Sequence, residues 1–116
     1  MSDTELPEGA IEVAVAEIWV NNWRNPTTPE QEAAKQSVLE LKGMWVPGED
    51  LINIMHETGA VNGRSYFAID EDNLIHTLYV GVDAAGNDMV DEEAGQYVYD
   101  FTRPCPPTCS GTGPFR

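Results

Sequence analysis

The sequence predicts an α+β domain in which two to three helices pack on one side of a three- or four-stranded, mainly antiparallel sheet. Two patterns favour this class: apolar residues at helical spacing in the first half, and alternating apolar and polar residues after Gly63. A length of 116 residues leaves room for one hydrophobic core. We therefore expect a single domain over residues 1–103 and a Cys/Pro/Gly-rich coil tail over residues 104–116.

The first predicted helix covers residues 8–23. Ile11, Val15 and Trp19 recur there at near-helical spacing. The helix should end before Pro26, because the residue that precedes a proline disfavours the helical conformation.

Two further helices are indicated by their ends. Thr28 supplies a hydroxyl at a helix start, proline follows it, and Gln31 stands three residues later, which is the order of a capping box. Gly43 is a natural stop for that helix. Apolar residues within 51–55 predict a short third helix, which Gly59 ends.

Strands are predicted from short runs rich in β-branched and aromatic residues. A brief strand is expected over 44–46, and an antiparallel hairpin over 64–70 and 74–83, joined by a polar turn. Alternation places His76, Leu78 and Val80 on one face of the second hairpin strand. Residues 96–101 read as the last strand.

The charge balance is strongly acidic, with 20 Asp and Glu against 6 Lys and Arg and a formal net charge of -14. Phosphate groups would be repelled, so we expect no direct nucleic-acid binding and no binding to anionic lipid through a basic face. A partner protein with a basic surface fits this charge. A cation is a further alternative, and a solvated surface with no specific partner is the simplest interpretation.

The beginning of the chain and its hydropathy bear on location. SDTELPEG after Met1 has neither a cationic n-region nor an apolar h-region, so we expect no signal peptide. No apolar run approaches the roughly 18 residues that span a membrane. We therefore expect a cytoplasmic protein without membrane insertion, in a compartment where structural disulfides are rare.

Both cysteines of the chain, Cys105 and Cys109, lie in the tail. Three states stay open for them: a disulfide, which needs a turn between them, a metal site completed by other ligands, or two reduced thiols. Zinc is the candidate cofactor if they are ligands. His56 and His76 do not have the spacing of a zinc finger with these cysteines.

Three segments of the C-terminal half, RSYFAID, LYVGVDAAGND and YVYDFTRPCPPTC, together resemble a family of short uncharacterised proteins from Bacteroidota-type bacteria. The pattern is an R-x-Y-x-x-I-D strand and a Y-D-F-T-x-P-C-P-x-x-C tail. The resemblance implies that Arg64, Tyr66, Asp100, Cys105 and Cys109 belong to the family pattern. It implies no substrate, and on this ground we take Arg64, Tyr66 and Asp100 as candidate binding residues.

The local surroundings of Arg64 and His76 favour structural roles. Arg64 is expected to pair with a carboxylate such as Asp100 or Asp70, and an anion-binding role is the functional alternative. His76 on the apolar face of a strand is more typical of a hydrogen-bonded histidine than of a catalytic base.

The function that the sequence favours is that of a small, non-enzymatic protein-protein interaction or accessory protein. No glycine-rich phosphate loop, serine elbow or H-E-x-x-H motif is present, which favours a role other than catalysis. One alternative is a metal-binding module with Cys105 and Cys109 as ligands. Another is an enzyme of unrecognised type that uses Arg64, Tyr66 or His76. Self-association through an edge strand is compatible with each of them.

Overall fold

The computed structural model describes the chain except for residues 1–5, 42, 101–102, 106, 109 and 115–116. The described part is a single small α+β domain, as predicted. Its α-helices are α1 (Val13–Arg24), α2 (Pro29–Ser37) and α3 (Gly48–His56). Its strands are β1 (Ala10–Ile11), β2 (Gly43–Trp45), β3 (Asn62–Ile69), β4 (Ile75–Val82), β5 (Asp88–Met89), β6 (Val98–Tyr99) and β7 (Arg103–Cys105).

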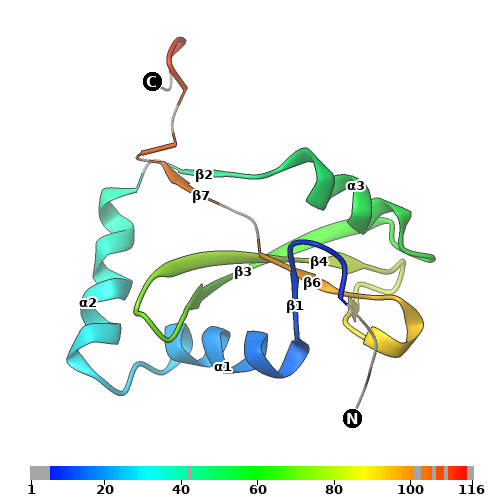
Figure 1. The fold of residues 1–116 in the computed structure, drawn as a ribbon, viewed down its shortest axis with the longest axis horizontal. Coiled ribbons are helices and arrows are strands. Elements are labelled where there is room, and N and C mark those ends of the chain that lie inside the picture. The colour runs from blue at the N-terminus through cyan, green and yellow to red at the C-terminus, as the bar shows by residue number, and fades with distance from the viewer. Residues whose placement is uncertain (1–5, 42, 101–102, 106, 109, 115–116) are drawn as a thin grey trace.

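The main sheet is antiparallel and is built on the long hairpin of β3 and β4. Its strand order is β1-β6-β4-β3, and β5 pairs with β4 outside this path (Figure 1). The predicted hairpin is therefore confirmed, and β6 is the short core of the last predicted strand. No helix in the described ranges combines the length and apolarity that crossing a membrane requires.

The register of the hairpin fixes which side chains share a face. Arg64, Tyr66 and Ala68 of β3 pair with Val80, Leu78 and His76 of β4, respectively. Paired residues lie on the same face of an antiparallel sheet. All six side chains therefore lie on one face, which agrees with the alternation in the sequence.

Helix α1 covers this face of the sheet. Ala16 is buried in a cluster with Ala68, Leu78, Val80 and Val98. The helix begins at Val13, later than the predicted residue 8, because the two residues of β1 pair with β6. The predicted end before Pro26 is confirmed.

The other face of the sheet meets α3. A Cβ atom on Gly81 would lie 3.5 Å from Cγ2 of Ile54 and 3.1 Å from Oε1 of Glu57, so the end of α3 lies directly over β4 there. Gly81 and Val80 are neighbours on a strand and point to opposite faces. The helices are thus spread over both faces of the curled sheet, where we had expected them on one side.

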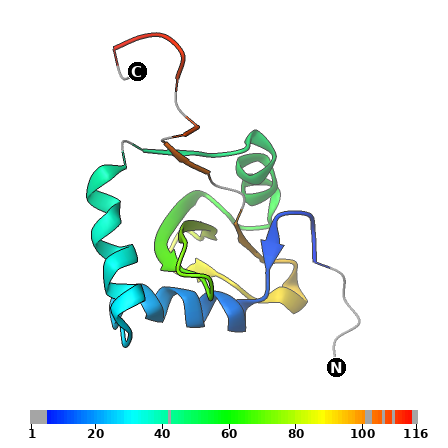
Figure 2. The same cartoon turned by 60° about the vertical axis from the view of Figure 1, so that its left-hand side comes forward.

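Helix α2 flanks the sheet beside the edge strand β3 (Figure 2). The rings of Trp23 and Phe67 are stacked with centroids 4.9 Å apart, and the ammonium of Lys35 lies 5.2 Å from the Trp23 ring centroid. The start of α2 is the predicted cap, since the Thr28 hydroxyl accepts the N–H of Gln31 at 3.0 Å. A 3-10 turn, Val38–Glu40, follows α2.

The start of the tail is more ordered than the sequence suggested. Residues 104 and 105, expected in the coil, belong to β7, which pairs with β2 in a separate two-stranded ladder. Pro104 lies opposite Met44 in this ladder. Proline is compatible with such an edge position, where its missing N–H removes little pairing.

Candidate functional site

Two of the three candidate binding residues meet at one carboxylate that the sequence analysis did not single out. Arg64 Nη1 donates to Oδ1 of Asp88, and the Tyr66 hydroxyl donates to Oδ2 of the same residue. Arg64 and Tyr66 come from one face of β3, and Asp88 comes from β5. Arg64 therefore pairs with Asp88, whereas we had expected Asp100 or Asp70.

The shared carboxylate fixes the protonation of both donors. The hydrogen bond to Asp88 raises the pKa of the Tyr66 hydroxyl, and burial adds to the effect. The pKa of Arg64 is raised by its hydrogen bond and attraction to the same carboxylate. A tyrosine held in its neutral form is a hydrogen-bond donor and a poor nucleophile at neutral pH.

This Arg64–Tyr66–Asp88 cluster borders a groove between α1 and the sheet. The groove has a volume of about 380 Å³, and Tyr66 and Asp88 both line it. The guanidinium of Arg24, from the last turn of α1, lies 5.9 Å from the Tyr66 ring centroid. Polar side chains of α1 and of the sheet thus meet at the same opening.

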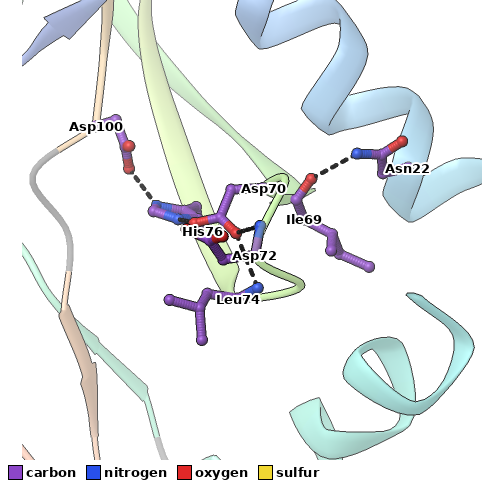
Figure 3. A network of polar contacts seen from close by, with 7 residues as sticks. All are labelled: Asn22, Ile69, Asp70, Asp72, Leu74, His76 and Asp100. Carbon is purple, nitrogen blue, oxygen red and sulfur yellow. Dashed lines mark hydrogen bonds and ion pairs between the residues drawn. The ribbon is translucent and has the colours of Figure 1, made fainter. Parts of the chain in front are cut away.

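The third candidate, Asp100, belongs to a separate cluster around His76. Nδ1 of His76 lies 2.7 Å from Oδ1 of Asp100, and Nε2 lies 2.6 Å from Oδ2 of Asp70 (Figure 3). The Trp19 ring covers the imidazole, with ring centroids 5.0 Å apart. His76 is therefore held by two carboxylates and one aromatic ring.

Asp70 also organises the turn between β3 and β4. Its Oδ1 accepts the N–H of Asp72 at 2.8 Å and the N–H of Leu74 at 3.0 Å. Asn73 in this turn adopts a positive φ of 63°, a conformation that asparagine tolerates better than most residues. The turn residues of the sequence thus place Asp70 where it reaches His76. Asn22 of α1 adds a further tie, since its Nδ2 donates to the Ile69 carbonyl at 2.9 Å.

The charges in this cluster keep His76 protonated. Burial acts to lower the pKa of His76, but the hydrogen bonds and attraction to Asp100 and Asp70 outweigh it and raise the pKa to about 9. Burial acts to raise the pKa of Asp70, but hydrogen bonds from Leu74 and His76 outweigh it and lower that pKa. Both ring nitrogens of the imidazolium therefore donate hydrogen bonds. Neither nitrogen is free to accept a proton, so this geometry gives His76 a structural role.

A second hollow of about 420 Å³ lies beside His76, between the β3–β4 turn, the end of α2 and β7. Ser37, Leu74 and Arg103 contribute to its wall. The Ser37 hydroxyl donates to the Ala34 carbonyl at 2.6 Å, which is a local contact within α2. His76, the titratable wall residue with a perturbed pKa, is already bound on both nitrogens.

Helix α3 carries a row of exposed apolar side chains. Leu51, Ile52 and Met55 are 47%, 56% and 51% exposed, whereas Ile54 is buried against the sheet. Residues 51, 52 and 55 lie on one side of a helix. Helix α3 lies at the periphery of the molecule (Figure 1), and the exposed fractions place this α3 row (Leu51, Ile52 and Met55) on its solvent side.

The acidic residues are largely without basic neighbours in the described part of the chain. The ion pairs found there involve only Asp70, Asp88 and Asp100 among the acids. The carboxylates of most other acidic residues are exposed to solvent, including Glu49 at the start of α3. The negative charge predicted from composition is therefore a property of the surface.

Cys105 of β7 is disulfide-bonded. The other cysteine of the chain is Cys109, which lies outside the described residues. A sulfur in a disulfide is not a thiolate, so a zinc site that uses Cys105 requires prior reduction. The metal role of Cys105 and Cys109 stays a prediction for the reduced protein. Among the described residues, no group of three or more His, Cys, Asp or Glu has the geometry to hold a metal ion.

The predicted candidates thus separate into three places in the fold. Arg64 and Tyr66 lie together at the groove, Asp100 lies at His76, and Cys105 lies in β7. Asp88 and Arg24 were missed. The sequence held a signal for each of them. Asp88 stands five residues after the predicted hairpin, and Arg24 stands at the end of an amphipathic helix.

Comparison of the chain with protein-family models, with curated proteins and with solved structures finds no match. The resemblance based on the C-terminal motifs therefore stays a prediction.

Proposed function

We propose that this protein acts by binding another protein, and that the α3 row makes the central contact. The observation that carries the proposal is the exposure of Leu51, Ile52 and Met55, each about half exposed on one side of a short helix. Apolar side chains that are exposed next to one another, and not scattered singly, favour an interaction surface. A protein partner would cover them and recover the free energy of burial.

The acidic surface around the row supports a basic partner. With a net charge of -14 and few local ion pairs, the long-range field of the chain attracts cations and repels anions. Charges at the edge of an interface mainly raise the rate of association and select among partners. Apolar contact at α3 would supply affinity, and charge would supply selection.

A photo-crosslinking amino acid placed at Ile52 tests the proposal in extracts of the source cells. The matched control carries the same amino acid at Leu39, which is 83% exposed on the 3-10 turn after α2 and lies outside the row. We expect a discrete adduct with a basic protein from position 52 and none from position 39. Its yield should fall as salt rises from about 0.05 M to about 0.5 M, because salt screens surface charges.

Three results would count against the proposal. No adduct at position 52, or the same adducts at both positions, would remove the α3 row as the contact. An adduct between two copies of the chain would indicate that the α3 row mediates self-association and does not bind a basic partner. A yield that does not change with salt would remove the electrostatic part.

A further inference from the structure

We infer that the groove between α1 and the sheet binds a small molecule with one carboxylate and an aliphatic body. The carboxylate would lie at Arg24 and the aliphatic body along the groove. This site is separate from the α3 row, and it does not depend on the protein-binding proposal.

Small apolar side chains form the floor of the groove. α1 presents Ala16 and Val20, and the sheet presents Val80 and Val98. Protein interiors normally leave few voids larger than a water molecule. A groove of about 380 Å³ lies within the range of small-ligand sites, and its apolar lining suits an aliphatic chain.

The mouth of the groove carries a guanidinium that no carboxylate neutralises within the described ranges. Arg24 has no ion pair there, although the chain contains 20 acidic and 6 basic residues. Arg64, which lies on the same side, is already bound to Asp88. Arg24 instead lies over the Tyr66 ring, with its guanidinium carbon 5.9 Å from the ring centroid, and this contact leaves the N–H groups at the edge of the guanidinium available.

Neighbouring groups support Arg24 in this role. The Tyr66 hydroxyl donates to Asp88, which fixes the ring beneath the guanidinium. The Oδ1 atom of Asn21 accepts a hydrogen bond from Asn25, so the amide hydrogens of Asn21 remain as donors at the same mouth. Guanidinium and amide donors together suit a carboxylate.

The charges nearby limit the ligand to a single negative charge. Glu17 lines the same groove, two helical turns before Arg24, and the whole chain is strongly acidic. A dianion such as a phosphate monoester costs more to remove from water into an apolar groove, and a single guanidinium neutralises only one of its two charges. A groove of about 380 Å³ lies at the small end of the range of ligand sites, which favours a medium-chain carboxylate over a long-chain one.

Decanoate, below its micelle concentration, is the probe for the test. Titration followed by two-dimensional NMR should shift the amide signals of α1 and of the facing strands, and calorimetry should give the affinity. Arg24→Gln should weaken binding roughly tenfold or more, because it removes a charge-assisted contact. Lys35→Gln is the matched control: it removes the same charge and a similar cation–π contact outside the groove, and should leave the affinity unchanged.

Ligand analogues and a filled groove complete the test. Decanol, decylamine and decyl phosphate should each bind more weakly than decanoate, and Val20→Phe should abolish decanoate binding by filling the groove. The inference is overturned if decanoate does not bind, if any analogue binds as tightly, or if Arg24→Gln and Lys35→Gln have equal effects. Signals that shift at α3 and not at the groove would also overturn it, and would show the α3 row as the apolar binding surface.

Discussion

The imidazole of His76 lies 2.7 Å from the carboxylate of Asp100, 24 residues further along the chain. This contact joins the central strand β4 to the residue that follows β6. On its other side, His76 binds Asp70, which shapes the β3–β4 turn. One protonated histidine thus connects three segments of the sheet.

The stability of the fold should depend on this proton. The pKa of His76 is about 9 in the folded chain, against 6.5 for an ordinary histidine. Because the folded state binds the proton more tightly, the contribution of His76 to the free energy of unfolding is complete below about pH 6.5 and is lost as the pH rises through about 9. It should amount to at most about 3 kcal/mol. Urea unfolding of the wild type and of His76→Gln, between about pH 6 and 10, measures it.

In that comparison the difference in unfolding free energy between the two proteins should shrink as the pH rises. A difference that stays constant over this range would show that the proton on His76 does not stabilise the fold.

Asp100→Asn should lower the pKa of His76, because it removes one of the two carboxylates that hold the imidazolium. The measurement is an NMR titration of the His76 ring, assigned by comparison with His76→Gln. Asp72→Asn is the control, since it removes a charge close to the same turn without touching the ring. If both variants shift the pKa equally, the direct contact contributes nothing beyond the general field.

Local patterns in the sequence were sufficient to predict the long elements. The cap at Thr28, the stop before Pro26 and the alternation over β4 are each decided by near neighbours, and the structure has all three. The two-residue strands β1 and β5 are too short to show a period. They exist because their partners in the sheet are already in place.

Which polar residues meet one another depends on the order of the strands in the sheet, and the periodicity of the sequence does not give that order. Alternation placed His76 and Arg64 on one face, but several aspartates could reach either of them. The pairing of Tyr79 with Tyr99 brings Asp100 to His76, and the pairing of Val82 with Asp88 brings that carboxylate to Arg64. Both assignments depend on contacts between residues far apart in the chain.

The redox state of Cys105 can be checked by intact mass. Protein purified without reductant or chelator should be lighter by about two hydrogens than the reduced protein, because Cys105 is disulfide-bonded. Zinc should bind only after reduction, if the two cysteines are ligands. Finding the reduced mass, or a metal adduct before any reductant is added, would contradict the disulfide.

Glu57, between the end of α3 and the sheet, is a carboxylate only 8% exposed. Oε2 accepts the N–H of Tyr97 at 3.0 Å, whereas Oε1 has no hydrogen-bond partner among the described residues. Burial raises the pKa of Glu57, and the hydrogen bond from Tyr97 only partly opposes it. The stability that this group contributes is present below its ordinary pKa of 4.5 and is lost as the pH rises through the higher folded value.

Gly81 is the position that makes room for this carboxylate. A Cβ atom there would lie 3.1 Å from Oε1 of Glu57, which cannot move away freely because Tyr97 holds its other oxygen. Gly81→Ala should therefore destabilise the fold by about 1 to 3 kcal/mol, as overpacking does. Glu57→Ala removes the clash but leaves the Tyr97 N–H without its acceptor, and should itself cost about 1 to 3 kcal/mol.

Combining the two substitutions separates the clash at position 81 from the loss of the hydrogen bond to Tyr97. In the Glu57→Ala background, the cost of Gly81→Ala should fall by more than about 0.5 kcal/mol, the usual limit of additivity for independent sites. Glu57→Gln is the control, since it keeps the length of the side chain and an oxygen for Tyr97. In the Glu57→Gln background, Gly81→Ala should destabilise the fold by about as much as it does in the wild type. If Gly81→Ala costs the same in all three backgrounds, the clash at position 81 does not come from Glu57. It then comes from Ala60, at 3.4 Å, and from Ile54.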